Sequence, residues 1–168
     1  MAQVFLSLGS NLGDRFFNLE NALDQIQEVA GEIVRRSSVY ETEPWGEYEQ
    51  PDFLNMAVVI DTRLDPYELL GKLKRIEKKL LRMDTKRWRE RLIDIDILFY
   101  ESKIILTDEL VVPHPCLQDR MFVLKPLMEL NADFVHPVFG KTISELVKKC
   151  MDPLKVEPVI LTYKRLNV

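Results

Sequence analysis

The chain has 168 residues, of which 46% are hydrophobic and 30% charged, with a formal net charge of -4 and a pI near 5.3. This composition predicts one globular domain spanning residues 1–168, with enough apolar residues for a proper core. The acidic balance argues against a broad nucleic-acid surface. No apolar run approaches the ~20 residues of a membrane span, and no signal-peptide pattern opens the chain. We therefore expect a cytoplasmic protein without a nucleic-acid or membrane partner.

Hydrophobic periodicity predicts the order strand, helix, strand, strand, helix, strand. The expected strands are Gln3–Leu8, Arg35–Glu41, Phe53–Asp61 and Ile93–Tyr100. The glycines from Gly9 to Gly13 lack the ending of a Walker loop, so we interpret them as a turn into the first helix. Asp65-Pro66 is a typical start for the second helix.

This βαββαβ order predicts an α+β fold of the ferredoxin-like type. We expect an antiparallel sheet with both helices on one face, the other face open to a ligand, and a C-terminal extension after Tyr100. Cys116 and Cys150 are far apart and without metal-ligand spacing, which favours reduced, structural thiols.

Alternation along the strands predicts which side chains share a face. The apolar sets that should meet the helices are Leu54, Met56, Val58 and Ile60 on one strand, and Ile93, Ile95, Ile97 and Phe99 on another. Phe53 and Asn55 should then share the open face with Asp94 and Asp96. An aromatic ring, an amide and two carboxylates on one surface suit a flat, hydrogen-bonding heterocycle beside a metal-bound phosphate chain.

The carboxylates of Asp94 and Asp96 would project from one face about 7 Å apart along the strand, and they are hard ligands that suit Mg²⁺. The alternative is an ordinary solvated outer face of a strand. The arginines just before the pair favour the metal-and-phosphate interpretation, because guanidinium groups bind phosphate oxygens in bidentate fashion. They are Arg82, Arg87, Arg89 and Arg91.

A proline-stiffened segment after the last predicted strand contains His114, followed by Arg120 and Phe122. A histidine in such a place is more often structural than catalytic, although its nitrogen could donate to a phosphate oxygen. Both interpretations stay open on the residues alone.

Taken together, these motifs resemble the 6-hydroxymethyl-7,8-dihydropterin pyrophosphokinase family of folate biosynthesis over nearly the whole chain. The segments that carry the resemblance are Gly9-Ser10-Asn11-Leu12, Tyr40-Glu41-Thr42-Glu43-Pro44, Gln50-Pro51-Asp52-Phe53-Leu54-Asn55, Arg75-Ile76-Glu77, Arg91-Leu92-Ile93-Asp94-Ile95-Asp96-Ile97-Leu98, and Val112-Pro113-His114-Pro115 with Arg120-Met121-Phe122. Single segments are weak signals, but their shared order is specific. The resemblance implies transfer of pyrophosphate from ATP to the pterin hydroxymethyl group, with release of AMP, by a monomer.

The resemblance also implies roles for individual residues. Asp94 and Asp96 match the ligands of two Mg²⁺ ions and, with Arg82 and Arg91, the catalytic set. Pterin contacts fall on Thr42, Pro44, Trp45, Phe53, Asn55, Trp88 and Phe122. ATP contacts fall on Lys74, Glu77, Arg82, Arg91, Ile97, His114 and Arg120.

The chain departs from the family pattern at Asp84, at Arg89-Glu90 and at Glu43, and we expect these departures to affect loop closure and nucleotide affinity more than the reaction. Two other function classes remain. A metal-dependent nucleotidyltransferase would release pyrophosphate and need a basic path for nucleic acid. A noncatalytic βαββαβ module that binds RNA would need stacked aromatic residues in basic surroundings, where Asp94 and Asp96 would repel the phosphates.

Overall fold

A computed structural model describes residues 1–44, 50–81 and 92–159 of the chain. Its elements follow in the order β1 (Ala2–Ser10), α1 (Arg15–Val29), β2 (Glu32–Arg36), β3 (Tyr40–Thr42), β4 (Phe53–Thr62), α2 (Pro66–Leu81), β5 (Asp94–Tyr100), β6 (Ile105–Leu106), β7 (Val111–Val112), the 3₁₀ turn η1 (Leu117–Asp119), α3 (Met121–Asn131), α4 (Ile143–Lys149) and β8 (Val156–Pro158). Among these described residues, no helix is both long and apolar enough to cross a membrane.

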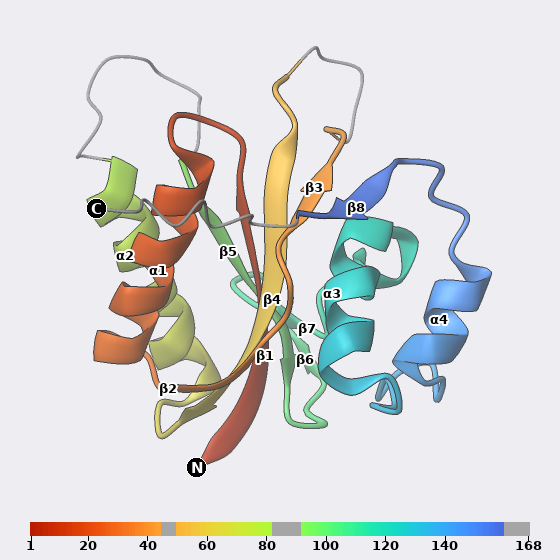
Figure 1. The fold of residues 1–168 in the computed structure, drawn as a ribbon. Helices are drawn as coiled ribbons and strands as arrows, with labels where there is room; N and C mark the ends of the chain where they lie inside the picture. Colours follow the sequence, from red (N-terminus) through yellow and green to blue (C-terminus); the bar gives the residue numbers. More distant parts are fainter. Residues whose placement is uncertain (45–49, 82–91, 160–168) are drawn as a thin grey trace.

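The main sheet has the strand order β5-β1-β4-β3-β8, and β2 also pairs with β4. The strand pairings in this sheet are antiparallel. An α+β fold with an antiparallel sheet is therefore confirmed. Figure 1 shows α1 and α2 on one side of the sheet and α3 and α4 on the other.

The starts of α1 and α2 are set by side chains that satisfy otherwise unpaired backbone N–H groups. Asp14 accepts a hydrogen bond from the Phe17 N–H at 3.0 Å. Asp65 accepts from the N–H groups of Tyr67 and Glu68, each at 2.9 Å. The Glu68 carboxylate accepts in return from the Asp65 N–H, so the predicted helix start at Asp65-Pro66 is confirmed.

The strand predicted at 35–41 is wrong, because the chain forms two strands there. Both β2 and β3 pair with β4, and the chain between them departs from strand geometry around Ser37. The Ser37 hydroxyl oxygen accepts a hydrogen bond from the Ala57 N–H at 2.9 Å, and the Ser37 N–H donates to the Ala57 carbonyl oxygen. The Ser37 hydroxyl thus takes the place of a backbone carbonyl in the hydrogen bonding to β4. The first strand is also longer than predicted, since Gly9 and Ser10 belong to β1 rather than to the turn.

Two hydrophobic clusters lie on the two faces of the sheet. The first joins α1 and α2 to alternate residues of the strands, and it contains the predicted helix-side set of β4 together with Ile93, Ile95 and Ile97. The second joins α3 and α4 to the opposite face. The expectation that this second face is open is therefore wrong for most of its length.

Phe99 was predicted to face α1 and α2, and this is wrong. The register between β1 and β5 passes from Phe5↔Phe99 to Leu6↔Ile97, so the pairing skips Leu98. A β-bulge of this kind reverses the alternation beyond it. Phe99 consequently packs edge-on against Phe5 in the α3 cluster, with ring centroids 5.8 Å apart, and Tyr100 takes the helix-side position.

Candidate active site

A cavity of about 300 Å³ opens where the uncovered ends of β1, β4 and β5 meet β3 and the start of α3. It lies on the α3 side of the sheet, at the N-terminal end of that helix. Eleven of the described residues line it: Ser7, Gly9, Thr42, Glu43, Gln50, Phe53, Asn55, Asp94, Asp96, Arg120 and Phe122. The predicted open face thus exists, but only as this cavity.

The two carboxylates of β5 both face the cavity and are half-buried. They alternate with Ile93, Ile95 and Ile97, which are at most 4% exposed on the other face. Their partners on β1 are small, since Gly9 is opposite Asp94 and Ser7 is opposite Asp96. The space beside the carboxylates is therefore left clear for a ligand, and the shared orientation predicted from alternation is confirmed.

Asn55 is held at the base of the cavity by a hydrogen bond from its amide nitrogen to the Thr42 Oγ1, at 2.7 Å. Both side chains are buried, with Asn55 4% and Thr42 2% exposed. This bond fixes the amide so that its oxygen Oδ1 lies toward Gly9, where a Cβ atom would come within 2.5 Å of it. Only glycine leaves room for Asn55 in this position.

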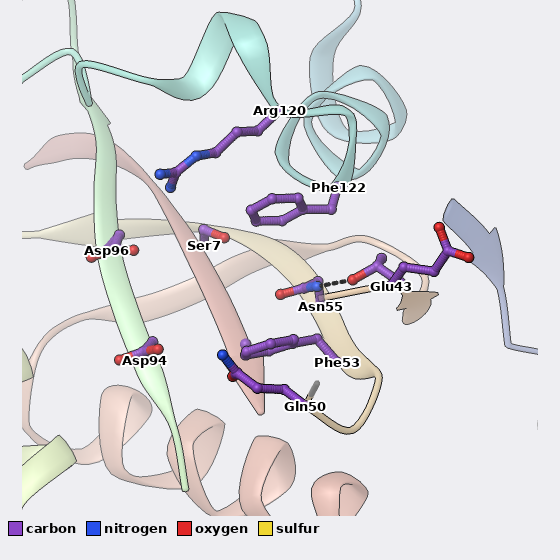
Figure 2. Close-up of a pocket in the computed structure, with 11 residues that line it drawn as sticks. Ser7, Glu43, Gln50, Phe53, Asn55, Asp94, Asp96, Arg120 and Phe122 are labelled. Atoms are coloured by element: carbon purple, nitrogen blue, oxygen red, sulfur yellow. Dashed lines mark hydrogen bonds between the residues drawn. The ribbon is translucent and has the colours of Figure 1, made fainter. Parts of the chain in front are cut away.

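The rings of Phe53 and Phe122 lie on the two sides of the Asn55 amide (Figure 2). Phe53 begins β4, and Phe122 is in the first turn of α3. Two aromatic rings with a fixed amide between them can hold a flat heterocycle by stacking on its faces and hydrogen bonding at its edge.

Arg120 immediately precedes α3, and its side chain extends into the cavity toward Asp96 (Figure 2). Its guanidinium carbon lies 5.8 Å from the centroid of the Phe122 ring, within the range of a cation–π contact. A cationic group on the wall opposite two carboxylates can bind phosphate oxygens, and the part of the cavity around Phe53 can hold a flat ring.

His114 does not line the cavity, but the charges of Asp96 and Arg120 act on its imidazole ring. Burial lowers the pKa of His114 below its usual value; Asp96 opposes this shift and Arg120 adds to it. The ring nitrogen Nδ1 accepts a hydrogen bond from the Cys116 N–H at 3.3 Å, and the His114 N–H donates to the Leu98 carbonyl oxygen. These hydrogen bonds hold the His114 ring and backbone in place, and the second ring nitrogen is the one that can meet a ligand.

Besides His114, three further predicted ATP contacts lie outside the cavity lining: Lys74, Glu77 and Ile97. Glu77 of α2 accepts a hydrogen bond from the Ile95 N–H at 2.8 Å and pairs with Lys74 at 2.9 Å. Ile97 packs under α1 and α2. Glu77 acts on the cavity indirectly, because Ile95 lies between Asp94 and Asp96.

Four predicted site residues lie outside the described residues: Trp45, Arg82, Trp88 and Arg91. Pro44 is described and half-buried next to the cavity residue Glu43, but it does not line the cavity.

Four residues of the cavity were missed as site residues by the sequence reasoning: Ser7, Gly9, Glu43 and Gln50. Ser7 and Gly9 alternate with Leu6 and Leu8 on β1, so the period-2 pattern applied to β4 and β5 could also have found them. Gln50 accepts a hydrogen bond from the Asn11 side-chain nitrogen at 3.3 Å, a contact between residues 39 apart that no local pattern predicts.

The donor atoms of the cavity fit Mg²⁺ bound together with phosphates. The described residues contain no group of three or more His, Cys, Asp or Glu side chains that could enclose a metal by themselves. Mg²⁺ commonly takes one or two carboxylates and completes its shell with water and phosphate oxygens. Asp94 and Asp96 supply that number, and the cavity leaves the remaining positions to a phosphorylated ligand.

The chain is similar to known proteins over most of its length. A sequence model of the family described as 7,8-dihydro-6-hydroxymethylpterin-pyrophosphokinase (HPPK) matches residues 5–132. A 2-amino-4-hydroxy-6-hydroxymethyldihydropteridine pyrophosphokinase of Aquifex aeolicus is 43% identical over 145 residues, which are 86% of this chain and 90% of that protein. The protein of the same name from Methylorubrum extorquens is 42% identical over 160 residues, covering 95% of this chain and 99% of that one.

Solved structures share the fold. A crystal structure of wild-type Plasmodium falciparum HPPK-DHPS with SDX-DHP matches 89% of this chain with a TM-score of 0.72. The sequence identity is 21%, so this similarity shows a shared fold and nothing about function. The match covers 43% of the Plasmodium chain, so this chain corresponds to less than half of that protein.

Proposed function

The chain belongs to the 7,8-dihydro-6-hydroxymethylpterin-pyrophosphokinase family, and from this premise we propose that it transfers pyrophosphate from ATP to the hydroxymethyl group of 6-hydroxymethyl-7,8-dihydropterin. This reaction belongs to folate biosynthesis and releases AMP. The observation that carries the proposal is that Asp94, Asp96, Phe53 and Asn55 line one cavity.

The pterin occupies the part of the cavity between Phe53 and Phe122. The ring is flat and carries donors and acceptors along its edge, which match the amide of Asn55 and the hydroxyl of Thr42. The buried bond between these two side chains holds the amide in place before the ligand arrives, so little entropy is lost on binding.

ATP occupies the part of the cavity bounded by Asp94, Asp96 and Arg120. We assign two Mg²⁺ ions to the two carboxylates; when bound, they neutralise the charge of the triphosphate and of the transition state. Arg120 binds phosphate oxygens from the α3 side. Arg82 and Arg91 are proposed to bind the transferring group, and Trp45, Trp88 and Pro44 to border the pterin.

The pterin hydroxyl oxygen attacks the β-phosphorus of ATP in line. A new bond forms between that oxygen and the β-phosphorus, the bond from the β-phosphorus to the bridging oxygen breaks, AMP leaves with the bridging oxygen, and the hydroxyl proton passes to solvent. The residues of the chain contribute positioning and electrostatic stabilisation, which supply most of the rate in phosphoryl transfer. Among the described residues, the cavity lining contains no histidine.

The wider expectations also remain proposals. We propose a ferredoxin-like framework, supported by the order β5-β1-β4-β2 with α1 and α2 on one face. We further propose one domain over residues 1–168, acting as a monomer in the cytoplasm on small-molecule substrates.

The proposal is tested by incubating the purified protein with ATP and Mg²⁺, with and without 6-hydroxymethyl-7,8-dihydropterin, and separating the nucleotides by chromatography. AMP should form only in the complete mixture. Formation of ADP, or of AMP at the same rate without the pterin, would refute the proposal.

A further inference from the structure

The N-terminal end of α3 lacks a side-chain cap of its own, because the side chain of its N-cap residue extends into the cavity. Ser, Thr, Asp and Asn normally hold this position and accept a hydrogen bond from the first turn. Here the N-cap is Arg120, which makes no capping hydrogen bond with its side chain and extends into the cavity. The N–H groups of the first turn therefore need a partner from elsewhere.

Asp152 supplies that partner from 31 residues further along the chain. Its Oδ2 accepts a hydrogen bond from the Met121 N–H at 2.9 Å, and its Oδ1 accepts from the Leu154 N–H at 3.0 Å. The same carboxylate thus holds the first residue of α3 and its own turn at once. A negative charge at a helix N-terminus is also favourable.

Residues 152–158, which begin with Asp152, also contact the opposite wall of the cavity, which is formed by β3 and Glu43. β8 pairs with β3 along the edge of the sheet, with Val156 opposite Thr42. The Lys155 N–H donates to the Glu43 carboxylate at 3.2 Å, and Lys125 of α3 donates from its Nζ to the Val156 carbonyl oxygen at 2.8 Å. Figure 1 shows β8 alongside β3 near the start of α3.

We infer that Asp152 is a positioning residue for pterin binding: through residues 152–158 it holds Phe122 on α3 at a fixed distance from Thr42 on β3. The inference rests on the proposed function for its ligand. It places a determinant of substrate affinity outside residues 5–132, the part of the chain that the family model matches. Asp152 touches neither substrate in this account and acts only through the backbone of Met121.

The inference predicts a loss of pterin affinity that is larger than the loss of nucleotide affinity. In Asp152→Ala both hydrogen bonds are lost, so the first turn of α3 frays and Phe122 is no longer held over the pterin. The dissociation constant for 6-hydroxymethyl-7,8-dihydropterin, measured by fluorescence titration in the presence of a nonhydrolysable MgATP analogue, should rise about fivefold to tenfold, in line with the loss of a helix cap. That for the analogue should change less than about twofold. Asp152→Asn keeps one acceptor oxygen and should lie between Asp152→Ala and the unmodified protein, which also provides a test should the alanine variant fold poorly.

Glu157→Ala is the matched control, because Glu157 lies in β8, is exposed and pairs only with the exposed Lys155 among the described contacts, at 3.1 Å. This variant should bind the pterin normally. Amide hydrogen exchange of residues 121–123 in the ligand-free protein is the second readout and should accelerate in Asp152→Ala but not in Glu157→Ala.

An unchanged pterin dissociation constant in Asp152→Ala, or an equal loss in Glu157→Ala, would overturn the inference while leaving the proposed function intact. If the unmodified protein binds no pterin, the proposed function and the pterin part of the inference both fail. Hydrogen exchange would then still show whether Asp152 caps α3.

Discussion

At the scale of single residues, the cavity depends on a close approach between Gly9 and Asn55. A Cβ on residue 9 would lie 2.5 Å from the Asn55 Oδ1, closer than nonbonded atoms can approach. Asn55 cannot move away freely because it is buried and bonded to Thr42. The backbone of β1 and the side chain of β4 thus fix each other.

We predict that Gly9→Ala displaces the Asn55 amide and raises the KM for the pterin by about tenfold, as expected for one lost hydrogen bond of about 1.4 kcal/mol. The KM for ATP should change much less. Gly71→Ala is the control, because a Cβ at this position in α2 meets no atom within 4 Å. That variant should keep its kinetics and gain about 0.5–1 kcal/mol of unfolding free energy. Equal pterin KM values in the two variants would contradict the role of Gly9.

A second prediction concerns the carboxylate pair. Asp96→Ala should reduce kcat by at least about a hundredfold to a thousandfold, since a proposed ligand of the Mg²⁺ that would neutralise transition-state charge is removed. The thermal unfolding midpoint should change little, because Asp96 is half-buried and faces the cavity rather than the core. Near-normal turnover of this variant with Mg²⁺ would refute the assignment.

At the scale of secondary-structure elements, β5 lies at one edge of the sheet, where α2 supports it by apolar packing and by the carboxylate of Glu77. Glu77 accepts the hydrogen bond of the Ile95 N–H, which points away from β1. Since Asp94 and Asp96 flank Ile95, Glu77 holds the strand that carries both carboxylates.

We predict that Glu77→Ala lowers the unfolding free energy by about 1–3 kcal/mol, because a partly buried N–H loses its acceptor. kcat/KM should also fall. Glu77→Gln retains a carbonyl oxygen, so its losses of unfolding free energy and of kcat/KM should be less than half those of Glu77→Ala. Glu20→Ala, which removes an exposed carboxylate 3.9 Å from Arg36, is the control and should cost less than about 0.5 kcal/mol. The prediction fails if Glu77→Ala is no less stable than this control, as urea denaturation would show.

The elements also show where a sequence pattern can predict a site. Asp94, Asp96, Phe53 and Asn55 could be assigned to one face because strand alternation is a local property, unbroken over the ends of β4 and β5 that carry them. Phe99 could not, because the bulge that reverses it depends on pairing with β1. Ser37 was assigned to a strand for a similar reason, since only its contact with Ala57 reveals the interruption.

At the scale of the whole molecule, the second face of the sheet is covered by α3 and α4, and this packing includes a buried histidine. His136 is 2% exposed, and its Nδ1 accepts from the N–H groups of Val138 and Phe139 at 3.2 and 3.3 Å. Its ring lies edge-on to Phe99, with centroids 5.4 Å apart. Burial lowers the pKa of His136 below its usual value of 6.5.

This lowered pKa predicts that acid destabilises the fold. Below pH 6.5 the unfolded chain binds a proton at His136 that the folded protein does not accept until a lower pH, so stability is full above pH 6.5 and falls as the pH drops toward the folded pKa. The urea midpoint should decrease from pH 7.5 to 5.5. His136→Asn keeps an acceptor for the two N–H groups but cannot titrate, so its midpoint should fall less steeply. Equal slopes in the two proteins would contradict the prediction.

The order of the first six expected elements indicated the antiparallel sheet and the layer of α1 and α2. These helices and strands are amphipathic, and the spacing of their apolar residues is a local pattern that can be read from the sequence. The layer of α3 and α4 was expected only as an unspecified extension. Its contacts join residues far apart in the chain, such as Asp152 with Met121, and no local period encodes such pairings.

The central claim, that one cavity joins the pterin to the β-phosphorus of ATP, is tested most directly by ³¹P NMR of a complete reaction mixture. The ATP signals should be replaced by the single resonance of AMP and by two coupled resonances of a diphosphate ester on the pterin. Signals of ADP with a pterin monophosphate, or of free pyrophosphate with an adenylylated product, would contradict it.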